Sequence, residues 1–273
     1  MRYKKTILII LTAMLLILFF LWQNNAIIVN EYQYKTDKIG NHFDGFKIAQ
    51  ISDLHNKEFG KNQKHLLKKL RKADPDIIVL TGDQVDSRKT NIPVVLEFVQ
   101  EALTIAPVYY ISGNHELRLN HRNYNDLMGG LIDLGAIPMD NRVMEITKDG
   151  EHGFNLLGLS DNHLIDYTLH NLNSDLPDDR LQIVLAHEPQ YIHRYSISGA
   201  DLVLSGHAHG GQFRIPGIGG LVAPGEGIFP KYTSGPYLVG DTTMIVSRGL
   251  GNSIIPIRIF NRPQVIIIEL KKT

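Results

Sequence analysis

The 273-residue sequence predicts an α/β fold preceded by a membrane-spanning helix. Short runs rich in Ile, Val and Leu alternate with amphipathic stretches, which is the pattern of strands and helices packed in layers. A separate apolar run near the N-terminus approaches the thickness of a bilayer. Polar residues follow many of the strand-like runs, which indicates where such a fold carries its chemistry.

The N-terminal segment is predicted to be a transmembrane anchor over residues 6–23, after a cytoplasmic N-terminus over residues 1–5. Residues 7–22 are apolar except for Thr12. Sixteen residues rising about 1.5 Å each span about 24 Å, slightly less than a hydrocarbon core of about 30 Å. A buried core helix is disfavoured because this run is apolar on every face.

The residues flanking the apolar run predict its orientation. The basic residues before it are Arg2, Lys4 and Lys5, and no acidic residue occurs before Glu31. This bias places the N-terminus in the cytoplasm and the following domain, residues 26–271, outside it, in a single-pass protein of the cell membrane. A cleaved signal peptide is the alternative. Residues 22–26 are large or polar at most positions where a cleavage site has small residues, so we favour the uncleaved anchor.

Nine runs are predicted as strands of the domain. Residues 30–34 alternate polar and aromatic side chains, as in a half-buried strand. The other eight are apolar runs of four to six residues, as expected for strands buried on both faces. They are residues 47–52, 77–81, 108–112, 154–159, 182–186, 202–205, 244–247 and 265–270.

Helices are predicted between these strands at residues 62–73, 92–102 and 124–134. The first places three leucines on one face, with Asn62 as its N-cap. Residues 206–251 differ from the rest because they hold 12 of the 24 glycines, so we expect loops and short edge strands there.

The composition excludes several classes of protein. Lys and Arg total 28 and Asp and Glu total 28, so no broad basic surface for nucleic acid is evident. The chain has no Cys, which excludes disulfides, thiolate metal sites and thiol nucleophiles. Any transition metal must therefore be held by imidazole, carboxylate or amide groups, and the 12 His are the first hint of such a site.

Five polar clusters follow predicted strands, at the edge where the carboxyl ends of parallel strands meet. In chain order they contain Asp53 and His55; Gly82, Asp83 and Asp86; Gly113, Asn114, His115 and Glu116; His187; and Gly206, His207 and His209. Each cluster alone is weak evidence, because an Asp after a strand is often a helix cap and a lone His is often structural. Together they predict one site.

Carboxylate oxygen and imidazole nitrogen together suit Zn, Fe or Mn. A carboxylate can bridge two such ions about 3.5–4 Å apart, an arrangement that serves phosphoryl transfer. We therefore expect two divalent metal ions per chain. A further candidate for lining the pocket is the segment of Asp161, Asn162 and His163, which follows the strand at residues 154–159.

The five clusters resemble the complete motif set of the calcineurin-like metallophosphoesterase superfamily, over about residues 47–209. The glycines and arginines at residues 247–251 and 256–263 resemble its membrane-anchored phosphodiesterase branch, typified by the bacterial proteins YkuE and YaeI. The resemblance implies a two-sheet sandwich in four α/β/β/α layers. It also implies a hydrolase that attacks phosphorus in line with a hydroxide bridging two metal ions.

The same resemblance implies roles for individual residues. The first metal would be held by Asp53, His55, Asp83 and His209. The second would be held by Asp83 as a bridge and by Asn114, His187 and His207. The catalytic pair would be His115, which stabilises the phosphoryl oxygens or protonates the leaving group, and Asp86, which orients it. Glu116 is either a support for the ligands or a surface residue.

One departure from the family pattern bears on the substrate. Phosphoprotein phosphatases of this superfamily carry Arg directly after the second Asp of the Gly-Asp motif, whereas this chain has Ser87 there. The expected substrate is therefore a phosphodiester or pyrophosphate, with a lipid-linked or cell-envelope ester suggested by the anchor. A nucleotidase or cyclic-nucleotide phosphodiesterase is the alternative, and a non-catalytic scaffold is a more distant one.

Overall fold

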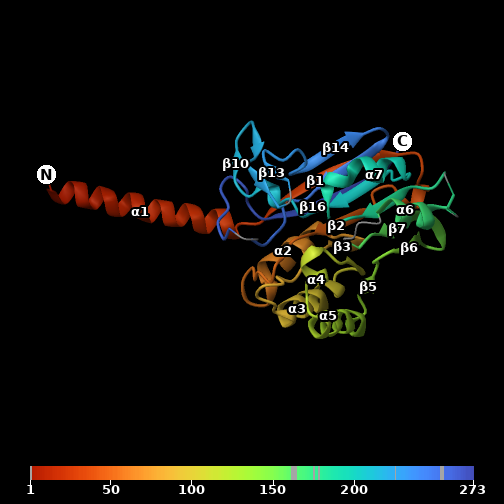
Figure 1. The fold of residues 1–273 in the computed structure, drawn as a ribbon, viewed down its shortest axis with the longest axis horizontal. Coiled ribbons are helices and arrows are strands. Elements are labelled where there is room, and N and C mark those ends of the chain that lie inside the picture. Colours follow the sequence, from red (N-terminus) through yellow and green to blue (C-terminus); the bar gives the residue numbers. More distant parts are fainter. Residues whose placement is uncertain (1, 161–164, 175, 178, 225, 253–254) are drawn as a thin grey trace.

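Two stacked β-sheets form the centre of the domain in a computed structural model, and helices cover both outer faces (Figure 1). The structure describes residues 2–160, 165–174, 176–177, 179–224, 226–252 and 255–273. This four-layer α/β/β/α arrangement confirms the predicted fold class.

The first sheet is mixed and has six strands in the order β1-β16-β2-β3-β4-β5. Its strands are β1 (Ile28–Thr36), β16 (Gln264–Lys272), β2 (Lys47–Ile51), β3 (Ile77–Thr81), β4 (Val108–Ile111) and β5 (Ile137–Pro138). β2, β3, β4 and β5 are parallel to one another, whereas β16 is antiparallel to β2 and parallel to β1. The pairing of Ile28 with Gln264 through Thr36 with Lys272 brings the first and last strands of the domain together.

The second sheet also has six strands, in the order β14-β15-β9-β8-β7-β6. Its strands are β14 (Gly235–Val239), β15 (Thr242–Val246), β9 (Leu202–Ser205), β8 (Gln182–Leu185), β7 (Glu151–Gly158) and β6 (Arg142–Lys148). The inner strands β15, β9, β8 and β7 are parallel, and the edge strands β14 and β6 join by antiparallel pairing. All nine runs predicted as strands are strands of one sheet or the other.

The core lies in three apolar layers. One separates the first sheet from α2 (Lys64–Ala73), α3 (Ile92–Leu103) and α5 (His121–Leu134), as Leu70 and Phe98 illustrate. A second fills the space between the sheets, where Val79 and Leu204 are both fully buried. The third separates the second sheet from α6 (Ile165–Asn173) and α7 (Ile192–Ile197). Since both sheets are covered on both faces, their central strands carry the continuous apolar runs of buried strands.

Helix α2 begins later than the sequence suggested, so the predicted Asn62 cap is wrong. Asn62 and Gln63 have φ of 52° and 56°, in the left-handed region, and α2 starts at Lys64. The Gln63 side chain accepts a hydrogen bond from Phe59 N at 2.9 Å and donates one to Lys57 O at 2.7 Å. Asn suits a left-handed turn as well as a cap, so the local sequence does not distinguish the two.

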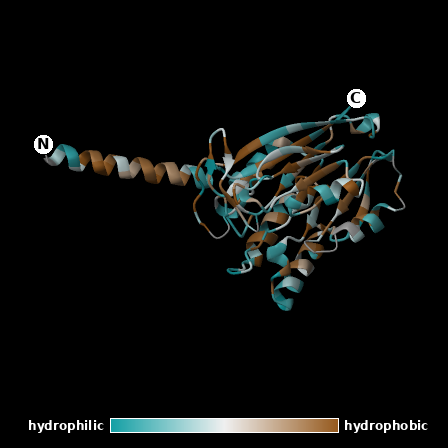
Figure 2. Ribbon diagram, turned by 45° about the horizontal axis from the view of Figure 1, so that its top comes forward, coloured by the Kyte–Doolittle hydropathy of each residue, from teal (hydrophilic) through white to brown (hydrophobic). Residues whose placement is uncertain are grey.

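Helix α1 (Arg2–Asn25) projects away from the domain (Figure 1) and is mainly hydrophobic (Figure 2). Most of its apolar side chains are exposed. Among the described residues it is the one helix long and apolar enough to cross a membrane, with a mean hydropathy of 2.5 over its apolar window. A signal sequence satisfies the same criterion. The helix extends beyond the predicted residues 6–23 at both ends.

The glycine-rich segment forms two small hairpins between the sheets and α1. They pair β10 (Arg214–Ile215) with β11 (Gly219–Gly220), and β12 (Val222–Ala223) with β13 (Gly227–Ile228). Figure 1 shows β10 and β13 at the end of the domain from which α1 projects. The expected loops and short strands are therefore present. The two hairpins stand outside both main sheets, whereas β14 and β15, near the end of the same segment, belong to the second sheet.

Candidate metal centre

The predicted site residues converge on one edge of the sandwich, where five parallel strands end. Asp53 and His55 follow β2, Asp83 and Asp86 follow β3, and α4 (Asn114–Leu117) begins after β4. The second sheet contributes His187 after β8, and His207 and His209 after β9. Every cluster named from the sequence reaches this edge.

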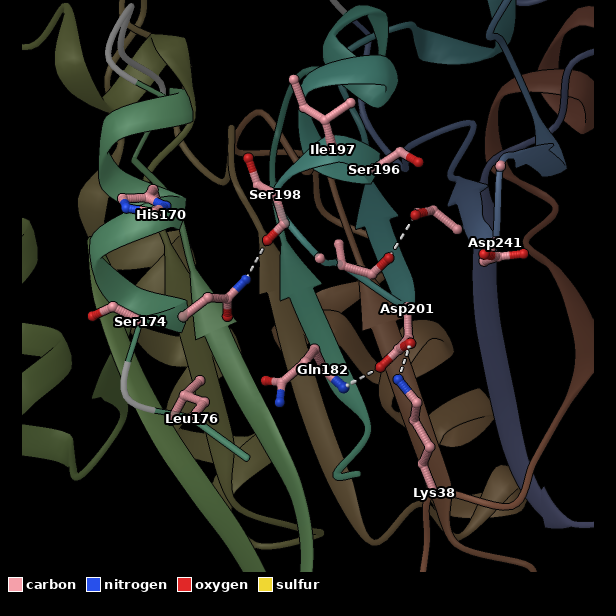
Figure 3. A pocket seen from close by; sticks show the side chains of 15 residues that line it. Lys38, His170, Ser174, Leu176, Gln182, Ser196, Ile197, Ser198, Asp201 and Asp241 are labelled. Atoms are coloured by element: carbon pink, nitrogen blue, oxygen red, sulfur yellow. Dashed lines mark hydrogen bonds and ion pairs between the residues drawn. The ribbon is translucent and has the colours of Figure 1, made fainter. Parts of the chain in front are cut away.

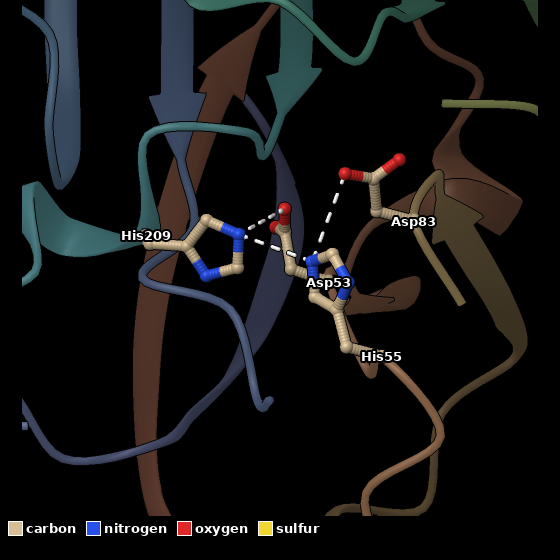
Figure 4. A group of neighbouring side chains, drawn as sticks. All are labelled: Asp53, His55, Asp83 and His209. Atoms are coloured by element: carbon tan, nitrogen blue, oxygen red, sulfur yellow. Dashed lines mark hydrogen bonds and ion pairs between the residues drawn. The ribbon is translucent and has the colours of Figure 1, made fainter. Parts of the chain in front are cut away.

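The first group of potential ligands comprises Asp53, His55, Asp83 and His209, all buried (Figure 4). Each offers one ligand atom, and these four atoms lie within 4.8 Å of one another. The two imidazoles face each other with 3.1 Å between their Nε2 atoms, and His209 Nε2 lies 3.4 Å from Asp53 Oδ1. Two neutral imidazoles and two carboxylates around one point form a donor set that suits a divalent cation.

The second group comprises Asp83, His187 and His207, with Asn114 beside them. Nδ1 of His187 lies 2.8 Å from Thr81 O, and since a carbonyl oxygen only accepts, this nitrogen is the donor. Nε2 of His187 lies 3.2 Å from Asp83 Oδ2. Burial lowers the pKa of His187, but the Asp83 carboxylate outweighs burial and holds that pKa well above its usual value, so a proton lies between the two groups. A metal ion would replace this proton, because imidazoles and carboxylates bind metals in their deprotonated forms.

The electrostatics of the groups also favour bound cations. Burial raises the pKa of Asp53 to about 6. Burial lowers the pKa of His55 to about 4 and that of His207 to about 3. Burial would raise the pKa of Asp83, but neighbouring imidazoles, above all that of His187, hold this pKa well below its usual value. The neutral imidazoles of His55 and His207 and the ionised carboxylate of Asp83 have the protonation states that metal binding requires, whereas His187 would lose its proton when a cation binds.

The loops that carry the site are backbone-strained. Five of the potential ligand residues have positive φ between 46° and 65°, namely Asp53, His55, Asp83, His207 and His209. Such conformations cost about 1–3 kcal/mol each and concentrate at functional sites. Position 113 requires glycine because the Asp83 side chain packs closely against its backbone. A Cβ at this position would lie 2.5 Å from Asp83 Oδ1.

The His115 imidazole is held by a backbone amide. The N–H of Ser87 donates to Nδ1 of His115 at 3.0 Å. Asp86 Oδ1 lies 3.8 Å from the same nitrogen, too far for a hydrogen bond, and accepts from Arg88 N at 2.8 Å instead. The expected Asp86 contact is thus electrostatic, while Ser87 N–H fixes the tautomer.

Glu116 is fully buried beneath the site and is not a surface residue. Its carboxylate accepts three backbone hydrogen bonds, from Asp83 N and Gly113 N at 2.8 Å and from Val85 N at 3.0 Å. Burial raises the pKa of Glu116 to about 8. Glu116 therefore ties the loop after β3 to the loop after β4, which are the loops that present Asp83 and Asn114.

A cavity of about 460 Å³ opens above the metal groups and carries two cations that the sequence did not single out. Arg88 and Arg118 line it together with His115. The Asn114 amide lies 2.6 Å from Nη1 of Arg118 on one side and 3.0 Å from Nδ1 of His207 on the other. The positive charges of Arg88 and Arg118 suit a phosphate ester entering this cavity.

A larger cavity, about 650 Å³, lies at the other end of the second sheet (Figure 3). Its lining includes Gln182, at the start of β8, and Asp201, just before β9, with Lys38 Nζ 2.7 Å from Asp201 Oδ1. None of the proposed metal ligands lines it. The candidate pocket segment at residues 161–163 lies outside the described residues.

Comparison with known proteins gives the family context of this geometry. The calcineurin-like phosphoesterase family matches residues 46–211. The metallophosphoesterase YkuE of Bacillus subtilis is 30% identical over 249 residues, covering 89% of this chain and 85% of that protein. The phosphodiesterase YaeI of Escherichia coli is 28% identical over 239 residues, covering 82% of each chain.

Solved structures show the same fold at low sequence identity. TT1561 of Thermus thermophilus superposes with a TM-score of 0.51 at 12% identity, covering 76% of this chain and 90% of its own. The NAD nucleotidase of Haemophilus influenzae superposes with a TM-score of 0.52 at 14% identity, covering 75% of this chain and 45% of its own.

Proposed function

The chain belongs to the calcineurin-like phosphoesterase family, a family of metal-dependent hydrolases acting on phosphoester bonds, and from that premise we propose that it cleaves phosphodiester or pyrophosphate bonds beside a membrane. The observation that carries the proposal is the position of Asp83. Its Oδ2 lies 3.7 Å from His55 Nε2 and 3.2 Å from His187 Nε2, so one carboxylate adjoins both groups of ligands.

Two divalent ions, Zn, Mn or Fe, would occupy the two groups. The first would be held by Asp53, His55, Asp83 and His209, and the second by Asp83, Asn114, His187 and His207. When bound, such ions supply Lewis acidity and lower the pKa of water, so that a nucleophile forms near neutral pH. The buried, mostly neutral donors fit this use, because they leave the ions' charge largely available to a phosphate ester.

The chain's own residues would position the ester and stabilise the charge that develops on its oxygens. Arg118 would bind the non-bridging phosphoryl oxygens from the cavity wall. Since Ser87 N–H donates to Nδ1 of His115, the neutral imidazole carries its proton on Nε2 and would donate a hydrogen bond to a phosphoryl or departing oxygen as negative charge develops there. Removing one such donor typically costs about 10²–10³-fold in rate. Asp86 Oδ1, 3.8 Å from Nδ1, would act on the ring through its charge.

We further propose that residues 6–23 form an uncleaved anchor, with residues 1–5 in the cytoplasm and the domain, residues 26–271, outside it. The contacts of the anchor's end support this. Gln23 is 2% exposed and its Oε1 accepts from Asn261 N at 3.3 Å. Arg262 Nε donates to Ala26 O at 2.8 Å, and its guanidinium stacks on Trp22. Cleavage before Ala26 would remove several of these contacts.

The substrate would be a lipid-linked or cell-envelope ester, because the anchor holds the site near the bilayer. The name phosphodiesterase carried by YaeI favours a diesterase, while a nucleotidase or cyclic-nucleotide phosphodiesterase remains the alternative. The chain carries all seven residues proposed as ligands together with His115, which disfavours a non-catalytic scaffold.

One substrate panel tests the proposal. The purified chain is assayed with Mn²⁺ or Zn²⁺ against a bis-aryl phosphate, an aryl monophosphate, cyclic nucleotides and lipid pyrophosphates, with Asp83→Asn as the inactive control. We expect the diester or the pyrophosphates to be turned over fastest. Preferential hydrolysis of the monophosphate or of cyclic nucleotides would favour the alternative enzymes instead.

A further inference from the structure

Among the described residues on the part of the domain next to α1, four large apolar side chains are more than half exposed. Ile218, Ile228, Phe229 and Phe260 are each between 52% and 74% exposed, and we call this set the juxta-anchor face. Three of them belong to the two small hairpins and the turns that follow (Figure 1). Apolar residues that gather at one place on a surface generally mark a contact with another apolar phase.

The juxta-anchor face is continuous with the anchor helix. The ring of Phe260 lies edge-on to that of Phe19 in α1, with centroids 5.9 Å apart. Phe260 and Ile218 line one hollow in the surface, and Ile218 and Phe229 line a neighbouring one. The apolar surface therefore runs from the C-terminal end of α1 onto the hairpins.

Two of these side chains are held outward at an energetic cost. Phe229 has φ of 54° and Phe260 has φ of 50°, although neither is glycine. The left-handed region is sterically unfavourable for a side chain as bulky as Phe. Exposing an aromatic ring to water adds an unfavourable term, which burial in an apolar phase would remove.

Cationic side chains adjoin the same surface. Arg214 lines both hollows, Arg248 lines one of them and Lys231 the other. Nε of Arg248 donates to Ser234 Oγ, and Nη1 of Arg214 donates to Thr233 Oγ1. Because both partners are uncharged hydroxyl groups, they do not neutralise the two positive charges. Basic groups beside exposed aromatic rings are typical of surfaces that meet lipid headgroups.

We propose that the juxta-anchor face rests on the surface of a phospholipid bilayer, with Phe229, Ile218 and Phe260 entering the headgroup region and the basic residues beside anionic headgroups. This inference rests on the proposed anchor. A bilayer is the occupant because the face continues the apolar surface of α1. Pro224, in the β12–β13 hairpin, lines the metal cavity, so the hairpin that touches lipid also borders the site.

The absence of Cys makes a direct test possible, since a single introduced cysteine can be labelled uniquely. Full-length Ile218→Cys and Phe229→Cys carry an environment-sensitive fluorophore in nanodiscs of phosphatidylcholine and phosphatidylglycerol, with or without doxyl-labelled lipid. Ile197→Cys in α7, where the native side chain is 82% exposed, is the matched surface control, and Leu11→Cys reports on the anchor. Retained hydrolysis shows that each variant is folded.

We expect doxyl lipid to quench the labels at residues 11, 218 and 229 at least twofold more than the label at residue 197. Quenching at residue 11 with none at residues 218 and 229 would overturn the proposed face while leaving the anchor intact. No quenching at residue 11 would overturn the anchor itself. Blue-shifted but unquenched emission at residues 218 and 229 would assign the face to a protein contact and also contradict the proposal.

Discussion

The backbone N–H of Ser87 donates a hydrogen bond to Nδ1 of His115 at 3.0 Å. This contact, rather than a carboxylate, fixes which imidazole nitrogen carries the proton in the neutral ring. It leaves Nε2 as the donor in the cavity that the metal groups share. A carboxylate 3.8 Å away, on Asp86, adds charge without competing for the hydrogen bond.

Replacing His115 tests its assignment as a hydrogen-bond donor to the reacting oxygens. His115→Ala should lower kcat by about 10²–10³-fold while the bound metal stays the same, because His115 is no proposed ligand. Ser87→Ala is the matched control, since it removes an Oγ 3.2 Å from Nδ1 but keeps the N–H. It should retain activity within a few fold. Loss of metal from His115→Ala would mean that the residue is a ligand.

Arg118 is expected to bind substrate. Arg118→Ala should lower kcat/KM by about 10- to 100-fold, mainly through KM, because a hydrogen bond to a charged group contributes about 1.5–3 kcal/mol. Arg122→Ala, on the exposed face of α5, should change neither constant. An unchanged KM in Arg118→Ala would remove Arg118 from the binding site.

Glu116 should matter for stability and metal affinity together. Its three partners are all backbone N–H groups that need an accepting oxygen. In Glu116→Gln the side-chain NH₂ group, which only donates, would face at least one of them. We expect unfolding free energy to fall by about 1–3 kcal/mol, with weaker metal binding as Asp83 shifts. Thermal unfolding and metal titration measure both. Glu101→Gln, half-exposed on α3, is the control, and equal effects of the two changes would contradict the role.

The end of the anchor should contribute to the stability of the domain. Gln23→Leu leaves the buried N–H of Asn261 without its acceptor, which costs about 1–3 kcal/mol, or roughly 2–10 °C in Tm for a chain of this size. Gln33→Leu, exposed on β1, is the matched control and should have little effect. Identical melting of both variants and the wild type would show that the helix end is not part of the folded unit.

A reporter fused to the C-terminus tests on which side of the membrane the domain lies. A reporter enzyme that folds only outside the cytoplasm, joined after Thr273, should be active if residues 6–23 span the membrane with the N-terminus inside. Activity of a cytoplasm-only reporter at the same position would reverse the orientation.

Much of this structure follows from local sequence. Apolar runs such as residues 77–81 are buried strands, and the polar residues directly after them meet at one edge because parallel strands end together. The position of Asp83 and its companions was therefore predictable from their place after strand ends.

Other features leave no such signal. Every residue except Pro carries a backbone N–H, so nothing in the sequence marks Ser87 as the partner of His115 or selects the three donors to Glu116. The left-handed turn at Asn62 and the burial of Gln23 depend on tertiary contacts between distant segments. Arg118 reaches the cavity through the turn of the chain after α4, which its neighbours in sequence do not reveal.

The central proposal is that this chain hydrolyses phosphoesters with two divalent ions, both of which Asp83 would help to hold. The most direct test removes metal with a chelator, restores Mn²⁺ stepwise, and measures bound ions per chain and hydrolysis of a bis-aryl phosphate in the same samples. The account predicts no activity without metal, a maximum at about two ions per chain, and weakened binding of both ions in Asp83→Asn. Full activity of the metal-free chain, or a maximum at one ion, would contradict it.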